Sequence, residues 1–450
     1  MRNLLKHNHK LQEVPYQDHI ASVYQSGNSP LQSVIPITFQ ITEDCNLCCS
    51  YCYQIGKTHH KMSIETVKKA VDIILSGEMW EKNNIPLAVE LDFIGGEPLL
   101  EIDLIRDIYE YFLKKCIELN HPWLLRHRIS ICSNGVLYFD PKVQDFLKRY
   151  GQNVSFSVSL DGTKELHDAC IVFKDGPGSY DIAIKAARHY RANFGEPGSK
   201  ITISPQNVQY VFDAIINMRK EGYDTVFANC IFEKGWTDDN ARELYRQMIK
   251  LSDYCYDNDT YETFSTSLFE ESFFCPIDYT VENKNWCGGT GNMLAVDYRG
   301  IFYPCLRYMP SSLGEKVKPI VIGNLEHGIF KTEEEKKIKN TLESITATSQ
   351  SSQKCISCPI RSGCAWCSAY NYQETGSVNC RVTYICSMHK ARALANAYYW
   401  NKFYEKHNIP SYYINYVPAE WGIALLGNEE WKRLVLIEKA QKERSEKNGM

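Results

Sequence analysis

The sequence predicts an α/β fold in which a partial (β/α)6 TIM-like barrel is followed by a cysteine-rich C-terminal domain. Between about residues 34 and 260, short runs rich in Val, Ile and Phe alternate with helical patterns. After about residue 262 this alternation ends, and aromatic, cysteine-bearing loops run to about residue 386. The 450 residues include 18 cysteines, several of them in tight clusters. We therefore expect one part built from strand-helix units and a second part held together by metal.

Six runs in the first part are predicted to be strands, at residues 36–42, 88–94, 128–133, 153–160, 199–204 and 224–231. Residues 63–76 are amphipathic and begin with Ser63, a favourable N-cap, so they predict a helix. Ser204 followed by Pro205 predicts another helix start, with Ser as the cap and Pro at the first helical position. Repeated strand-helix units favour a parallel sheet with right-handed crossovers, and six units make an open, partial barrel.

This pattern divides the chain into four segments. Residues 1–33 form an N-terminal arm, and residues 34–262 form the barrel. Residues 263–407 form the cysteine-rich domain, whose last part, 387–407, has a helical pattern. Residues 408–450 are a C-terminal extension.

Composition excludes several classes of protein. The net charge is -4 and the charged fraction is 23%, so the chain lacks the basic surface of a nucleic-acid-binding protein. The N-terminus lacks the apolar core of a secretion signal, and no apolar run is long enough for a membrane helix. We therefore expect a cytoplasmic protein that binds neither nucleic acid nor membrane. In a reducing cytosol, clustered thiols indicate metal or iron-sulfur ligands rather than disulfides.

The first cysteine cluster follows the first predicted strand. Cys45, Cys49 and Cys52 have the spacing C-x3-C-x2-C, so their thiolates can hold three irons of a 4Fe-4S cube and leave the fourth iron without a protein ligand. Cys48 is either a bystander or a competing ligand. The alternative is a zinc loop or an ordinary cluster of reactive thiols.

Other short motifs follow the next three predicted strands. They are Gly95-Gly96-Glu97-Pro98, Ser133-Asn134-Gly135 and Ser159-Leu160-Asp161-Gly162. Because the carboxyl ends of parallel strands meet at one edge, we expect these motifs and the cysteine loop to converge. For the second and third motifs, ordinary turn chemistry is the competing interpretation. Cys230, at the end of the sixth strand, faces the cavity or is simply a buried small apolar residue.

The cysteine loop and the Gly-Gly-Glu strand end together resemble the radical S-adenosylmethionine (radical SAM) superfamily. The resemblance implies that Cys45, Cys49 and Cys52 hold a catalytic, radical-generating cluster whose open iron binds S-adenosylmethionine. It further implies cofactor contacts from two places, namely Tyr51 and the Gly-Gly-Glu motif of Gly95, Gly96 and Glu97. A carboxylate complements an ammonium, and glycines allow close backbone approach. Ribose or carboxylate contacts then fall to Ser133, Asn134, Ser159 and Asp161.

A second constellation resembles the SPASM auxiliary-cluster extension of peptide-modifying radical enzymes. Its residues are Cys287, Gly300 and Cys305, then Cys355-x2-Cys358-x5-Cys364-x2-Cys367, and finally Cys386. The family usually has three residues between its fifth and sixth cysteines, whereas this chain has two. The resemblance implies one cluster on Cys355, Cys358, Cys364 and Cys386. A second cluster takes Cys287, Cys305 and Cys367, with Cys275, Cys380 or no residue as fourth ligand. A zinc ribbon is the alternative.

The resemblance implies an oxidative peptide maturase with S-adenosylmethionine and three 4Fe-4S clusters. The chain is most similar to ranthipeptide and sactipeptide maturases, which join Cys sulfur to carbon in ribosomally made, Cys-rich precursor peptides. Sulfatase-maturating, formylglycine-generating enzymes are the alternative, although they commonly have an Asp where this chain has Leu306. A non-catalytic iron-sulfur or zinc scaffold is an alternative from another class.

The same resemblance predicts the partners of this chain. They are a Cys-containing precursor peptide and a low-potential electron donor, flavodoxin or ferredoxin. Many related maturases begin with a leader-binding domain, and only about 33 residues precede the first predicted strand here. Leader recognition is then expected from residues 1–33, from the region after residue 400, or from a separate leader-binding protein.

Overall fold

The computed structural model describes residues 34–54, 57–80, 85–270, 287–361, 363–408 and 418–436. Within these ranges, six parallel strands lie side by side in the order β1, β3, β4, β5, β7 and β9. Their bounds are Val34–Gln40, Ala88–Ile94, His127–Ser133, Val154–Ser159, Gly198–Ile203 and Ala228–Cys230. All six predicted strands are thus confirmed, although the last prediction covers both β9 and a separate short strand, β8 (Thr225–Val226).

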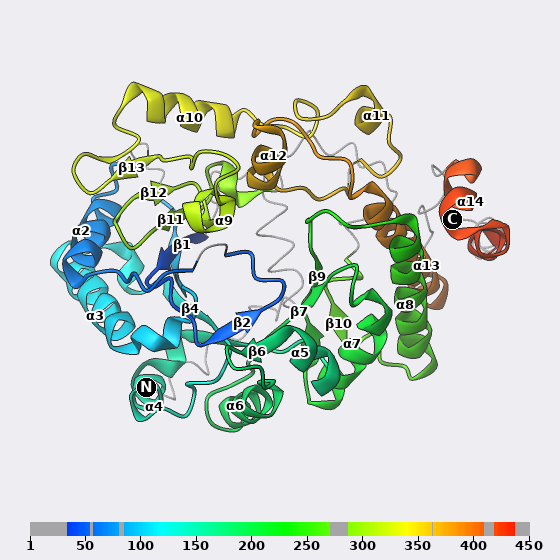
Figure 1. Ribbon diagram of the computed structural model, residues 1–450, viewed down its shortest axis with the longest axis horizontal. Coiled ribbons are helices and arrows are strands. Elements are labelled where there is room, and N and C mark those ends of the chain that lie inside the picture. Colours follow the sequence, from blue (N-terminus) through cyan, green and yellow to red (C-terminus); the bar gives the residue numbers. More distant parts are fainter. Residues whose placement is uncertain are drawn as a thin grey trace.

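Helices connect successive strands and lie around the outside of the sheet (Figure 1). They are α2 (Ile64–Leu75), α3 (Ile102–Glu118), α4 (Pro141–Tyr150), α5 (Lys164–Cys170), α6 (Tyr180–Asn193), α7 (Val211–Lys220) and α8 (Asp238–Asp257). The predicted Ser63 cap is confirmed, since the Thr66 amide donates to Ser63 Oγ over 3.1 Å. This mixed α/β arrangement with a parallel sheet is the predicted partial barrel.

The helix start predicted at Ser204-Pro205 is wrong. Residues 205–207 form a turn in which Asn207 Oδ1 accepts the Ser204 amide over 2.7 Å, and α7 begins only at Val211. An Asn side chain that satisfies the backbone in this way offers the chain an alternative to the helix.

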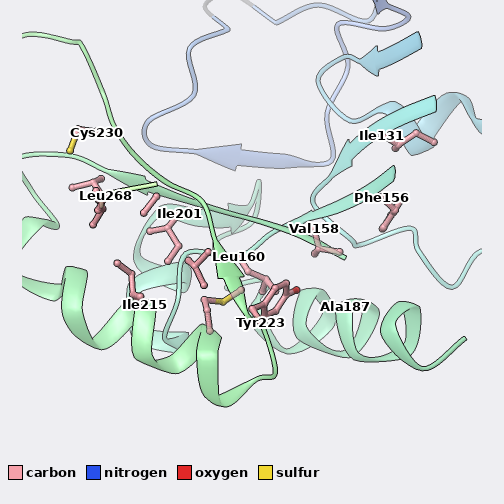
Figure 2. Close-up of a cluster of buried hydrophobic side chains, with 14 of the residues drawn as sticks. Ile131, Phe156, Val158, Leu160, Ala187, Ile201, Ile215, Tyr223, Cys230 and Leu268 are labelled. Atoms are coloured by element: carbon pink, nitrogen blue, oxygen red, sulfur yellow. The ribbon is translucent and has the colours of Figure 1, made fainter. Parts of the chain in front are cut away.

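The core lies between the sheet and these helices. Figure 2 shows part of it, where Phe156, Val158 and Ile201 from the strands face the helical layer that includes Ala187 and Ile215. The opposite faces of the same strands point into the barrel, which leaves that interior available for polar side chains.

The second part of the chain adds to the same sheet. Strand β11 (Leu294–Val296) pairs in parallel with β1, and the antiparallel strands β12 (Phe302–Tyr303), β13 (Gly323–Asn324) and β14 (Gly328–Ile329) follow it. Two short two-stranded pairs also occur, β2 (Leu47–Cys49) with β6 (Ile171–Phe173) and β8 with β10 (Ser265–Thr266). The segment from Leu294 to Ile329, which includes Cys305, is therefore joined to the first strand of the barrel.

The helices of the second part are α9 (Pro310–Leu313), α10 (Glu333–Glu343), α11 (Gln353–Ile356), α12 (Ser368–Thr375), α13 (Cys386–His407) and α14 (Ala419–Leu426). The first of them, α9 and α10, lie beside this sheet extension, and the later α13 lies beside the barrel helix α8 (Figure 1). Helix α13 confirms the helical pattern predicted at 387–407, and it packs along α8. The arm predicted at 1–33 lies outside the described residues. Among the helices that are described, none is long and apolar enough to cross a membrane.

Candidate active site

Cys45, Cys49 and Cys52 lie in the loop after β1 and line one cavity at the carboxyl ends of the barrel strands. Asp44 Oδ1 accepts the Cys45 amide over 2.8 Å, and the Cys52 amide donates to the Cys49 carbonyl over 3.3 Å. Strand β2 holds the middle of the loop, because it pairs with β6 and sets Cys49 opposite Ile171. These hydrogen bonds and the strand pairing hold the loop in a defined conformation in which all three thiols line the same cavity.

Burial and mutual repulsion disfavour thiolates in this loop. Burial raises the pKa of Cys49 to about 12 and also raises the pKa of Cys45. Lys57 lies beside the three thiols, and its ammonium opposes this effect at Cys45 and Cys49. Buried thiols ionise when they bind iron, so this donor set fits a 4Fe-4S cluster with one open iron.

Cys48 lies apart from these three thiols. It is exposed, whereas its neighbours Leu47 and Cys49 are turned inward. Successive side chains of a strand point to opposite faces, and Cys48 occupies the middle of β2. Its position supports the bystander interpretation.

The Gly95-Gly96-Glu97 strand end is bonded directly to the cysteine loop. The Gly96 amide donates to the Thr42 carbonyl over 3.1 Å, and the Glu97 amide donates to the Asp44 carbonyl over 2.8 Å. A Cβ atom added to Gly95 would lie 2.7 Å from the Thr42 carbonyl oxygen, and one added to Gly96 would lie 2.0 Å from the Asp44 carbonyl oxygen. Both glycines line the cavity, and this structure also requires them for the close approach of the cysteine loop.

Glu97 is the most completely bonded carboxylate of the cavity. Its side chain is buried and accepts the Leu99 amide, the Ser133 hydroxyl and the Asn134 amide over 3.0, 2.7 and 2.8 Å. Burial raises the pKa of Glu97, and these donors and Lys57 oppose the rise. The residue is thus fixed in place as a candidate partner for an ammonium group.

The other predicted cofactor residues take different positions. Asn134 and Ser159 line the cavity, whereas Ser133 supports Glu97 and accepts the Gly135 amide over 2.9 Å. Asn134 Oδ1 also accepts the Val136 amide over 3.0 Å. The predicted turn chemistry therefore exists at Ser133 and Asn134 alongside their place at the site.

Asp161 is hydrogen-bonded to Tyr51, a residue that lines the cavity. The Tyr51 hydroxyl donates to Asp161 Oδ2 over 2.5 Å, and Asp161 Oδ1 accepts the Thr202 amide over 3.1 Å. Burial raises the pKa of Asp161 to about 6. The carboxyl group fixes the Tyr51 ring, which lies next to Cys52 in the sequence and lines the cavity.

The cavity has a volume of about 580 Å³, within the usual range for small-molecule sites. Sequence reasoning missed several of its polar residues, namely Lys57, Asp92, Cys132, Lys200, Thr202, Asn229 and Glu233. Asp92 carried a usable signal, because on β3 it alternates with the buried Leu91 and Phe93 and so had to face the interior of the barrel. Cys230 also lines the cavity, which was one of its two predicted positions.

Cys287, Cys305 and Cys367 form a second thiol group near the same cavity. Cys367 lines that cavity, and Cys287 Sγ lies 3.4 Å from Ser368 Oγ. A hydrogen bond from Cys367 lowers the pKa of Cys287, and burial raises the pKa of Cys305 to about 12. A Cβ atom on Gly289 would lie 3.1 Å from Cys305 Sγ and 3.5 Å from Cys287 Sγ, so this glycine leaves room beside the thiols.

Four more cysteines surround a separate cavity of about 200 Å³. They are Cys355, Cys358, Cys364 and Cys386, and Cys367 of the second thiol group also lines this cavity. Burial raises the pKa of Cys364 to about 12, and Arg381 opposes the rise. Cys380 is exposed, and Cys275 lies outside the described residues.

The structure places Cys45, Cys49 and Cys52 along one cavity and Cys355, Cys358, Cys364 and Cys386 along another, and Cys367 lines both. In the part of the chain that it describes, no three His, Cys, Asp or Glu side chains form a group that could hold a single metal ion. A cubane cluster takes one thiolate on each iron, so the thiols need not converge on one atom.

Comparison with known proteins agrees with this geometry. Residues 39–248 match the family model of the radical SAM superfamily. An uncharacterized protein of Methanocaldococcus jannaschii is 28% identical over 162 residues, which cover 35% of this chain and 50% of that protein. The antilisterial bacteriocin subtilosin biosynthesis protein AlbA of Bacillus subtilis is 21% identical over 316 residues, or 69% of this chain and 62% of AlbA. The chain therefore spans between half and two thirds of these two curated relatives.

Solved structures share the fold. The structure of anSMEcpe with bound AdoMet has a TM-score of 0.62 and 17% identity, and the match covers 83% of this chain and 99% of that one. Streptococcus suis SuiB bound to precursor peptide SuiA has a TM-score of 0.53 and 15% identity, with 82% and 79% of the two chains covered. These likenesses show that the chain shares the partial-barrel fold of these structures, and the segment that matches the radical SAM family model, residues 39–248, holds the Cys45, Cys49 and Cys52 loop.

Proposed function

We propose that this protein is a radical SAM peptide maturase that installs thioether crosslinks, from Cys sulfur to carbon, in a ribosomally made, Cys-rich precursor peptide. One observation carries the proposal: Cys367 of the second thiol group lines the same cavity as Cys45, Cys49 and Cys52. A peptide in that cavity would lie between a site that removes hydrogen and a site that accepts an electron. The relatedness of the chain to AlbA supports a peptide substrate.

Cys45, Cys49 and Cys52 would hold the cluster that binds S-adenosylmethionine, and together these groups supply a 5′-deoxyadenosyl radical that abstracts hydrogen. Glu97 would bind the ammonium group of the methionine moiety, since its buried carboxylate is already oriented by Ser133 and Asn134. The Tyr51 ring, held by Asp161, would form one wall of the adenine site. The barrel would position the peptide and exclude water from the reacting carbon.

The two auxiliary groups would hold two more 4Fe-4S clusters. The group of Cys355, Cys358, Cys364 and Cys386 supplies four thiols to one cavity, which suits a fully ligated electron carrier. The group of Cys287, Cys305 and Cys367 has three thiols and lies beside the substrate cavity. A low-potential flavodoxin or ferredoxin would supply the first electron.

The sequence around Cys305 favours this function over formylglycine generation. Leu306 occupies the position where sulfatase-maturating enzymes commonly have an Asp base, Arg307 follows it, and both residues line the cavity. A leucine cannot accept a proton, and an arginine in a protein stays protonated. These residues favour the thioether reaction over the sulfatase alternative.

The test is anaerobic incubation of the reconstituted protein with S-adenosylmethionine, reductant and a synthetic Cys-repeat peptide, followed by mass spectrometry. Thioether formation removes two hydrogen atoms for each crosslink and protects that cysteine from alkylation. Formylglycine would instead appear as an aldehyde that reacts with hydrazide, and it would contradict the proposal. A scaffold would cleave no S-adenosylmethionine, and the variant Cys49→Ala serves as the inactive control.

A further inference from the structure

Two charged side chains lie between the first and second thiol groups, and the functions assigned above do not use them. Arg307 Nη2 donates to Glu233 Oε1 over 3.1 Å, and both residues line the cavity. The Arg307 guanidinium carbon lies 5.5 Å from the ring centroids of Tyr53 and of Tyr370. Tyr53 directly follows Cys52, so this arrangement connects the cysteine loop to the auxiliary domain.

Arg307 is held in a fixed position. Two cation-π contacts and the ion pair with Glu233 restrict its planar guanidinium, whose charge does not change with pH. Glu233 follows β9 at the carboxyl edge of the barrel, and Arg307 fixes its carboxylate at the cavity wall. The side chains that face Glu233 from other elements include Arg307, Tyr370 and Tyr384.

A thioether reaction needs a proton acceptor. The peptide thiol must lose its proton, one hydrogen atom must leave the carbon, and one electron must leave as the carbon-sulfur bond forms. In the proposed function the hydrogen atom would go to the 5′-deoxyadenosyl group derived from S-adenosylmethionine, and the electron would go to the cluster that Cys287, Cys305 and Cys367 would hold. The proton remains to be assigned.

Few carboxylates in the cavity could accept that proton. Among its described lining residues, the carboxylates are Asp92, Glu97 and Glu233. Asp92 accepts from Thr38 inside the barrel, and the buried Glu97 accepts three hydrogen bonds. The Glu233 side chain is 43% exposed, so it can also release a proton to solvent.

We propose that Glu233 is the catalytic base that takes the proton from the substrate cysteine thiol, and that Arg307 is the positioning residue that holds the Glu233 carboxylate. This inference rests on the proposed function. It assigns to the segment after β9 the task that sulfatase-maturating enzymes give to the Asp after the cysteine. Proton transfer by a positioned base is worth about 10²–10⁴ in rate.

The experiment compares wild type with Glu233→Gln, Glu233→Asp and the surface control Glu65→Gln, using a Cys-repeat peptide that the wild type crosslinks. The ratio of crosslinked peptide to 5′-deoxyadenosine should fall about 100-fold in Glu233→Gln at saturating peptide. Glu233→Asp should recover part of the ratio, and Glu65→Gln should match the wild type. Fluorescence anisotropy should give the same peptide affinity for Glu233→Gln and wild type.

Two results would overturn the inference. The first is a Glu233→Gln variant with the wild-type ratio, and the second is a weakened peptide affinity whose effect disappears at saturating peptide. A wild-type protein that crosslinks no peptide at all would instead contradict the proposed function.

Discussion

The substitution Gly96→Ala tests whether the Gly-Gly-Glu strand end fixes the cysteine loop. The added Cβ would lie 2.0 Å from the Asp44 carbonyl oxygen and 2.8 Å from Cys45 Cβ, whereas real Cβ atoms essentially never approach other atoms within 3.0 Å. The Asp44 carbonyl oxygen is a backbone atom, so no side-chain rotation can relieve this contact. The cysteine loop must therefore move away from residue 96 by at least 1.0 Å. Overpacking of this kind costs about 1–3 kcal/mol.

The functional cost should be larger than the cost in stability. A displacement of about 1 Å in positioning can reduce a rate about 10²-fold, and the displaced segment carries Cys45 itself. We expect Gly96→Ala to cleave S-adenosylmethionine at least 100-fold more slowly than wild type and to bind fewer irons, while the auxiliary irons remain.

Gly288→Ala is the matched control. Its added Cβ would meet the flexible Met293 side chain at 3.4 Å, which is an ordinary contact. Iron content and cleavage of S-adenosylmethionine are measured in parallel for both variants. Wild-type cleavage by Gly96→Ala would refute the close-approach account of this glycine.

Three further predictions concern single side chains. Cys48→Ala should keep the wild-type iron content, because the Cys48 side chain is exposed on the face of β2 opposite to Cys49. Cys49→Ala should lose about four irons, and elemental analysis of both variants measures the difference. Glu97→Gln should cost about 1–3 kcal/mol in urea unfolding and weaken binding of S-adenosylmethionine in calorimetry, because its new NH2 group must face backbone or hydroxyl donors. Burial lowers the pKa of His167 to about 4, so the folded state prefers the neutral ring and loses stability as pH falls below about 6.5. Between pH 7 and pH 5 this group should remove about 2 kcal/mol from the free energy of unfolding, and His167→Asn should flatten that part of the pH profile; an unchanged profile would contradict the assignment.

The strands of the barrel could be predicted from sequence because each is a short apolar run with turn residues at its ends. The predicted 88–94 matches β3, and the predicted 128–133 differs from β4 by one residue. The strand β11 could not be predicted, since three residues carry no periodicity and its partner β1 lies more than 250 residues away. The same applies to β2, whose pairing with β6 turns Cys48 out of the site.

Some residues of the candidate site could be predicted from the sequence and others could not. The spacing of Cys45, Cys49 and Cys52 predicts the first group of thiols, and the structure brings these three side chains close together. The division of the later cysteines into two groups came from the resemblance to the SPASM extension, and the structure places the members of each group near one another. The Glu233-Arg307 pair has no such signal, because an ordinary Glu after a strand becomes part of a site only when a residue 74 positions away packs against it. Tertiary contacts of this kind leave no local pattern.

The most direct test of the account is the amount of iron, acid-labile sulfide and zinc per chain after anaerobic purification and reconstitution. Three cubane clusters require about twelve irons with matching sulfide and no stoichiometric zinc. About four irons with stoichiometric zinc would keep the radical site but contradict the auxiliary clusters on which the thioether proposal depends, and zinc without iron would contradict the radical chemistry as well.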